Sequence, residues 1–321
     1  MPSPRRGDQV SVEHHINRRQ AWTLAIRPQT LPAGAAPVVV GVGVAWRDGV
    51  FAVGPAIAAL AGAILIQIGT NLANDYYDAA KGVDTDERTG FTRVTQSGLL
   101  PAHAVKRAMW ASFAAAVVIG CYLAYIGGIP IVLIGIASIV AGITYAGGPL
   151  PFGSYGLGDL FVFIFFGLIG VSGTYYVQAV AVLAEPFPVW LPPGTLTSTV
   201  IIASIPIGCL TTAILVVNNY RDIESDATAG KRTLAVLIGP RATRIEFLCL
   251  VAIAFVVPAG LVLAGYGWSL ALPLLVLPYA GIVTLAMLTT PPGPSLNRTL
   301  EQTGKLLTGF AVLFAVGVIL A

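Results

Sequence analysis

The sequence predicts an all-α membrane protein with nine transmembrane helices, arranged as two four-helix halves followed by a last helix. Three observations support this prediction: an apolar composition, nine apolar runs, and an acidic motif that follows the second run of each half. Hydrophobic residues make up 56% of the 321 residues and charged residues only 10%, with a mean hydropathy of +0.81. A soluble domain carries about a quarter charged residues, so the composition excludes one.

Nine apolar runs of about 17 to 25 residues are long enough to span a bilayer. They lie near residues 24–46, 54–73, 104–126, 129–146, 158–184, 198–219, 245–265, 268–289 and 304–321. The halves 20–150 and 151–290 each hold four runs, which makes them a weak internal repeat. We expect one transmembrane domain over residues 21–321, preceded by a cytoplasmic arm, residues 1–20, that lacks a signal peptide.

The placement of charge predicts the orientation of the chain. All of the 18 Lys and Arg residues except Arg47 lie before or at the start of the first run, or after the second, sixth and eighth runs. By the positive-inside rule, the N-terminus and both acidic motifs then face the cytoplasm, and the C-terminus lies outside.

The first acidic motif occupies residues 71–86, directly after the second run. Asn71 and Asp75 are four residues apart, as are Asn74 and Asp78, so a helix would place these oxygen-bearing side chains on one face. Carboxylates at the mouth of a membrane span are costly and usually mark a functional site. Oxygen ligands without His or Cys suit Mg²⁺ that shares its coordination shell with substrate phosphates.

The second acidic motif, residues 218–232, directly follows the sixth run. Asn218, Asp222 and Asp226 repeat the four-residue spacing, and Asp222 lies 144 residues after Asp78. Either motif alone is compatible with an ordinary solvated loop. Two copies at equivalent places in two halves favour a pair that brackets a diphosphate through bridging metal ions.

Basic residues are interleaved with the acids in both motifs: Lys81, Arg88, Arg93, Arg221, Lys231 and Arg232. Some satisfy the positive-inside rule, and others are placed to neutralise diphosphate oxygens. Metal and Arg clamping makes diphosphate a good leaving group, and a water-poor cavity protects the cation that forms when it leaves an allylic carbon. The residues therefore predict metal-dependent diphosphate chemistry on a lipidic substrate. A cation-coupled transporter, the rival interpretation, would place its acids at mid-span without surrounding Lys and Arg.

The sequence Asn-Asp-x-x-Asp with a further Asp downstream, paired with Asp-x-x-x-Asp after the sixth run, resembles the UbiA superfamily of intramembrane aromatic prenyltransferases. The resemblance covers residues 20–321 and is strongest to the branch that prenylates 1,4-dihydroxy-2-naphthoate. Five segments carry it: 27–32, 71–84, 96–98, 145–159 and 218–239. The most specific part is Ala-Gly-Lys-Arg-Thr-Leu-Ala at 229–235. A Lys-Arg pair expected for a 4-hydroxybenzoate enzyme is missing from 145–159, although other aromatic acceptors stay open.

The resemblance implies transfer of a polyprenyl chain from polyprenyl diphosphate to 1,4-dihydroxy-2-naphthoate, with loss of diphosphate and CO₂, to give demethylmenaquinone. It implies a multi-pass enzyme of the bacterial cytoplasmic (inner) membrane, with the lipid bilayer but no nucleic acid as a partner. The implied Mg²⁺ ligands are Asn71, Asp75, Asp78, Asn218, Asp222 and Asp226, of which the four aspartates are catalytic. The implied substrate contacts are Asn71, Asn74, Lys81, Asp84, Arg93, Tyr145, Tyr155, Asp159, Asn218, Arg221 and Lys231. Tyr145, Tyr155 and Asp159 are candidates to face the aromatic acceptor, although an interfacial aromatic belt also accounts for the two tyrosines.

Overall fold

The computed structural model describes residues 16–81, 93–145, 147 and 151–321, and within these ranges the chain is helical, with no strand. Its α-helices are α1 (Arg18–Ile26), α2 (Leu31–Arg47), α3 (Val53–Lys81), α4 (Ala102–Thr144), α5 (Gly158–Val162), α6 (Gly170–Leu183), α7 (Ser198–Arg221), α8 (Ile223–Thr228), α9 (Leu234–Leu263), α10 (Leu277–Thr289) and α11 (Leu296–Ile319). A π-helical segment, Phe163–Ile169, joins α5 to α6. Short 3₁₀ helices occupy Pro28–Thr30, Phe152–Ser154 and Trp268–Val276.

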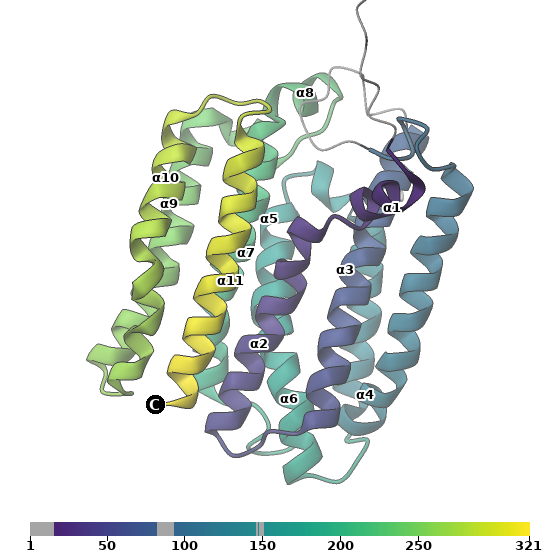
Figure 1. Ribbon diagram of the computed structural model, residues 1–321. Helices are drawn as coiled ribbons and strands as arrows, with labels where there is room; N and C mark the ends of the chain where they lie inside the picture. Colours follow the sequence, from purple (N-terminus) through teal and green to yellow (C-terminus); the bar gives the residue numbers. More distant parts are fainter. Residues whose placement is uncertain (1–15, 82–92, 146, 148–150) are drawn as a thin grey trace, which may run out of the picture.

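Eight helical stretches in the described part of the chain are long and apolar enough to cross a membrane. They agree with the nine predicted runs because one stretch, α4, holds two runs in succession. Its helical geometry breaks at Gly128, where φ is 65° and ψ is −153°, and the predicted gap between the third and fourth runs falls at this break. Ile139 and Ile143 after the break pack against the cluster that holds Met109 and Phe113 before it. Helix α4 is therefore a hairpin of two antiparallel legs beside α3 (Figure 1).

Glycine is required at the turn of this hairpin for two reasons. A φ of 65° is readily adopted only by residues without a Cβ. In addition, a Cβ added at Gly128 would lie 1.9 Å from the carbonyl oxygen of Pro188. The same carbonyl accepts a 3.0 Å hydrogen bond from the amide of Ile129, so the turn is anchored to the segment that follows α6.

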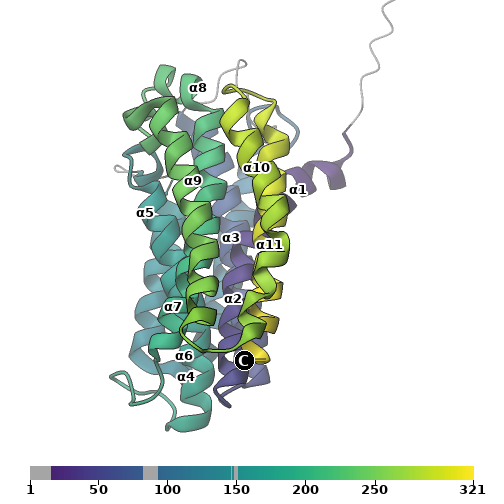
Figure 2. The ribbon, with the colours of Figure 1, turned by 90° about the vertical axis from the view of Figure 1, so that its left-hand side faces the viewer.

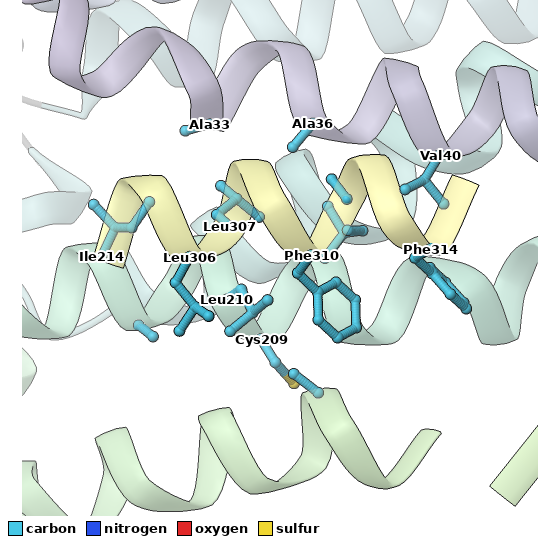
Figure 3. Packing of buried hydrophobic residues seen from close by; sticks show 14 of the residues in the cluster. Ala33, Ala36, Val40, Cys209, Leu210, Ile214, Leu306, Leu307, Phe310 and Phe314 are labelled. Carbon is cyan, nitrogen blue, oxygen red and sulfur yellow. The ribbon is translucent and has the colours of Figure 1, made fainter. Parts of the chain in front are cut away.

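The spans run along one common direction, with α1 and α8 near one end and the C-terminus at the opposite end (Figures 1 and 2). Helices α2, α7 and α11 form the centre of the bundle, where their buried side chains make one continuous cluster (Figure 3). In α7, 78% of the apolar window is buried, against 17% in α4. Helix α7 is therefore the central span, and α4 faces the surrounding lipid.

Close backbone contacts hold the helices together, because lipid offers little hydrophobic force for helix association. Gly167 of the π-helical segment meets Gly208 of α7, and a Cβ added at Gly167 would lie 2.6 Å from the Gly208 Cα. This contact leaves no room for a side chain. It holds the π-helical segment, and with it Phe166, against α7.

Gly167→Ala should destabilise the protein by about 1–3 kcal/mol, because the added methyl group overpacks a backbone contact. The thermal unfolding midpoint in detergent would measure this. Gly281→Ala on α10 is the matched control, since no atom of the described residues lies within 4 Å of a Cβ added there. Equal midpoints for the two variants would contradict the interpretation.

Candidate active site

Both acidic motifs lie at the same end of the bundle and line one polar cavity of about 220 Å³. The charged and amide-bearing residues that line it are Arg27, Gln67, Asn71, Asn74, Asp78, Arg93, Asn218, Asn219, Arg221, Asp222, Asp226 and Lys231. They come from the segment after α1, from α3, α7 and α8, and from the segments that precede α4 and α9. The two acidic motifs, one from each half, therefore line the same cavity, as their equivalent positions in the two halves led us to expect.

Asn71 connects α3 to the turn between α1 and α2. Its Nδ2 donates hydrogen bonds to the carbonyl oxygen of Ile26 and to the Oγ1 of Thr30, both at 2.8 Å. The Thr30 hydroxyl in turn donates to the carbonyl of Arg27 at 3.0 Å. Arg27 has the left-handed φ of 55°, which is unfavourable for a residue with a Cβ. These bonds hold it there, with Arg27 and Thr30 at the cavity wall.

Asp75 is buried and does not belong to the cavity lining. Its two carboxylate oxygens accept hydrogen bonds from the backbone amides of Val94 (3.1 Å) and Thr95 (2.9 Å). Asp75 therefore anchors the turn that begins at Arg93 and so positions that guanidinium. The geometry favours this positioning role over direct metal ligation, which stays a prediction.

Asp78 and Asp226, one from each motif, meet at the ammonium of Lys231. The Lys231 Nζ lies 3.8 Å from the Oδ2 of Asp78 and 3.8 Å from the Oδ1 of Asp226. Asp78 also pairs with the Nη2 of Arg93 at 2.5 Å, and both partners are almost fully buried. Charges of both signs thus compensate one another where solvent screening is weak.

Arg221 and Asp222 form a second buried pair. The Nε of Arg221 donates to the Oδ1 of Asp222 at 2.8 Å, and its Nη2 donates to the Oδ2 at 2.6 Å. The same guanidinium donates to the Oδ1 atoms of Asn218 and Asn297, each at 2.9 Å. Asn297 lies in the first turn of α11, and sequence reasoning missed it because no motif surrounds it.

The predicted acceptor residues take different positions. Tyr145, which follows α4, lines the polar cavity and the apolar cavity described below. Tyr155 is 52% exposed and lines neither. Asp159 is buried outside both linings, and its Oδ2 has no hydrogen-bond partner among the described residues. The side chain of Lys81 and all of Asp84 lie outside the part of the chain that the structure describes.

An apolar cavity of about 400 Å³ adjoins the polar one. It lies between α2, α3, both legs of α4 and the α5–α6 segment. Five residues line both cavities: Gln67, Thr70, Tyr145, Val162 and Phe166. Val117 and Ile136 of its lining are exposed on the outer surface, so the apolar cavity reaches the face that lipid covers.

The donor set of the polar cavity fits Mg²⁺ that is bound together with a diphosphate. Among the described residues, no group of three or more His, Cys, Asp and Glu side chains closes on one point. Asp78 and Asp226 nevertheless share the cavity, and the Oδ1 of Asn74, which also lines it, is buried and has no hydrogen-bond partner in the part of the chain that the structure describes. Mg²⁺ is characteristically held by one or two carboxylates, with substrate phosphates completing its shell.

The fold and the site define an intramembrane helical protein with a carboxylate- and Arg-lined cavity beside an apolar one. The chain belongs to the UbiA prenyltransferase family, whose model matches residues 35–300. It is 38% identical to the 1,4-dihydroxy-2-naphthoate octaprenyltransferase of Escherichia coli (strain K12), over 97% of this chain and 98% of that protein.

Two solved structures share the fold at about 15% identity. A UbiA homolog from Aeropyrum pernix K1 has a TM-score of 0.66 and 15% identity, covering 90% of this chain and 97% of its own. A UbiA homolog from Archaeoglobus fulgidus bound to DMAPP and Mg²⁺ has a TM-score of 0.59 and 15% identity, covering 92% of this chain and 99% of its own.

Asp75→Ala should release the turn after Arg93, because two amides lose a charged acceptor worth about 1.5–3 kcal/mol per bond. Hydrogen exchange at Val94 and Thr95 should then accelerate about tenfold or more. Asp78→Ala is the control, since Asp78 bonds neither amide in this structure. Unchanged exchange in Asp75→Ala would remove the positioning role.

Proposed function

We propose that the chain is a Mg²⁺-dependent aromatic prenyltransferase. It transfers a polyprenyl chain from polyprenyl diphosphate to 1,4-dihydroxy-2-naphthoate, with loss of diphosphate and CO₂, to give the reduced (quinol) form of demethylmenaquinone. The observation that carries the proposal is the junction of a charged cavity and an apolar cavity at five shared residues, because a polyprenyl diphosphate needs both environments side by side. The name of the Escherichia coli relative supports the choice of acceptor.

The diphosphate would lie among the cations of the polar cavity. Arg93, Arg221 and Lys231 all line that cavity and carry N–H donors suited to phosphate oxygens. Each of these three cations already pairs with a carboxylate before substrate binds. Lys81, at the end of α3, is a further candidate contact.

Asp78 and Asp226 would hold Mg²⁺ together with the amide oxygens of Asn74 and Asn218. Asp222 would contribute to Mg²⁺ binding through its carboxylate, which is paired with Arg221. Bound Mg²⁺ would neutralise the diphosphate and stabilise the charge that develops as it leaves.

The prenyl tail would occupy the apolar cavity, whose opening on the lipid-facing surface lets a long chain continue between helices and lipid. Tyr145, Val162 and Phe166 would surround the allylic carbon at the junction and exclude water from the cation formed there. The aromatic ring would then attack this carbon. Loss of the ring carboxylate restores aromaticity, so the reaction needs no dedicated base.

We place the protein in the bacterial cytoplasmic membrane, with the N-terminus and both acidic motifs on the cytoplasmic side and the C-terminus outside. Arg47, the one basic residue predicted on the outer side, ends α2 at the end of the bundle remote from α1. This arrangement is the one that the positive-inside rule requires.

An activity assay in detergent or membranes tests the proposal. It supplies polyprenyl diphosphate, Mg²⁺ and 1,4-dihydroxy-2-naphthoate, with 4-hydroxybenzoate in parallel and a chelator control. The expected result is a prenylated naphthoquinol formed with CO₂ release, and no product when the chelator is present. Product with 4-hydroxybenzoate alone would keep the mechanism and change the acceptor. No product with either acceptor would favour another acceptor or the transport interpretation.

Asp78→Ala and Asp222→Ala should each lower prenyl transfer at least about hundredfold, because each removes a charge from the diphosphate and metal cavity. Both proteins should still insert and elute as the unmodified protein does on size exclusion. Asp48→Asn is the control, since Asp48 accepts a hydrogen bond from Tyr175 away from the cavity. Near-normal turnover in either alanine variant would remove that aspartate from the site.

Asn297→Leu should lower kcat/KM for the polyprenyl diphosphate about tenfold, because Arg221 loses one of its fixed acceptors. Asn297→Asp keeps an acceptor oxygen at the same place and should retain most of the activity. Steady-state kinetics with the acceptor saturating would measure both. If the leucine variant matches the unmodified protein, Asn297 does not position the guanidinium.

A further inference from the structure

Gln67 is a buried amide at the point where the two cavities meet. It lies on α3 one helical turn from Asn71, and only 8% of it is exposed. It lines both cavities, as do the rings of Tyr145 and Phe166. No step proposed above uses its side chain.

The hydrogen-bond network fixes which way this amide points. The carbonyl of Ile26 can only accept, so it must face the Nδ2 of Asn71, at 2.8 Å. The Oδ1 of Asn71 is therefore the atom that faces Gln67, and it accepts from the Gln67 Nε2 at 3.5 Å. The same Nε2 lies 3.3 Å from the hydroxyl of Thr30. The nitrogen of Gln67 is thus turned toward these partners.

The carbonyl oxygen of Gln67 receives no hydrogen bond within the described ranges of the chain. Its Oε1 is buried and has no hydrogen-bond partner among the described residues. A buried acceptor that is left unsatisfied is costly, and native structures normally pair such atoms. Because the side chain lines both cavities, a ligand at the junction is the natural source of the missing donor.

The chemistry of the substrates identifies that donor. A prenyl tail has no polar hydrogen, and a diphosphate offers oxygen acceptors. Water bound to a metal can donate, but the nearest proposed Mg²⁺ ligand on α3, Asn74, lies roughly 10 Å further along the helix at 1.5 Å per residue. The aromatic acceptor carries ring hydroxyl groups, and it must meet the allylic carbon at this junction.

We propose that the Oε1 of Gln67 accepts a hydrogen bond from a ring hydroxyl of the aromatic acceptor. This inference rests on the proposed function, because it assigns the acceptor of that reaction to the junction. The bond orients the ring against the allylic carbon. It also draws the hydroxyl proton away from the ring oxygen, which makes the adjacent ring carbons more electron-rich. Gln67 thereby selects for acceptors with a free hydroxyl at that position.

The test compares 1,4-dihydroxy-2-naphthoate with its two mono-methyl ethers, in the unmodified protein and in Gln67→Met. Methylation removes the donor, so the unmodified protein should use one ether with kcat/KM about tenfold or more below that of the parent acceptor. In Gln67→Met the KM for the parent acceptor should rise about tenfold, and the penalty for that ether should fall below about threefold. The KM for polyprenyl diphosphate and the Mg²⁺ activation constant should stay within about twofold.

Three further variants separate acceptor binding from a structural role. Thr30→Val removes a partner of the Gln67 Nε2 but leaves the Oε1 in place, and it should keep the discrimination against the ether. Thr212→Val removes a buried hydroxyl of α7 that lines neither cavity and has no hydrogen-bond partner among the residues described, and it should match the unmodified protein. Gln67→Asn withdraws the oxygen by one methylene and should lose the discrimination, which covers the case in which Gln67→Met does not fold.

Each contrary result has its own meaning. If both Gln67 variants still discriminate fully against the methyl ether, this inference is overturned, whereas the proposed prenyl transfer is unaffected. A changed Mg²⁺ or polyprenyl diphosphate constant with unchanged discrimination would assign Gln67 to the diphosphate end and also overturn it. If the unmodified protein forms no product from the naphthoate, the proposed function fails, and this inference fails with it.

Discussion

The ammonium of Lys231, equidistant from a carboxylate of each acidic motif, is the interaction that joins the two halves of the protein at their charged end. Asp78 on α3 and Asp226 on α8 are largely shielded from solvent, so their carboxylates would repel each other without a cation between them. The cation reaches them because the chain after α8 folds back over the cavity, where the amide of Arg232 bonds the carbonyl of Ser154 at 2.9 Å. The polar cavity, its balance of charge and its closeness to the apolar cavity all depend on this convergence.

The first acidic motif divides its side chains between facing the cavity and holding its walls. Asp75 and Asp78 are three residues apart, so their directions differ by roughly 60° around a helix of 3.6 residues per turn. One carboxylate therefore faces the cavity, and the other faces the turn at Val94 and Thr95. In the sequence the acidic residues of this motif look equivalent. In the structure Asp78 faces the cavity, whereas Asp75 supports the turn that forms part of the cavity wall.

Composition and the lengths of the apolar runs were enough to predict the helical bundle, and even the break in α4 coincides with a gap between runs. The four-residue spacing placed Asn74, Asp78 and Asp226 at the cavity, because helical geometry is local. The spacing did not show that Arg221 would pair with its own neighbour, since that depends on side-chain rotamers. The role of Asn297 could not be predicted from the sequence for another reason. It contacts Arg221 only because α11 packs beside α7.

The second leg of the α4 hairpin, residues 129–144, makes roughly 24 Å of helix, which is several ångströms less than the thickness of a hydrocarbon core of about 30 Å. A span this short is generally accommodated by local thinning of the bilayer or by flanking residues that reach to the interface. Tyr145 is the first residue after this leg, so it marks the end of the span that is nearest to the headgroup layer. A flat amphiphilic molecule that has already partitioned into the headgroup layer would enter the junction sideways. In that geometry the membrane interface concentrates the ring before the protein binds it.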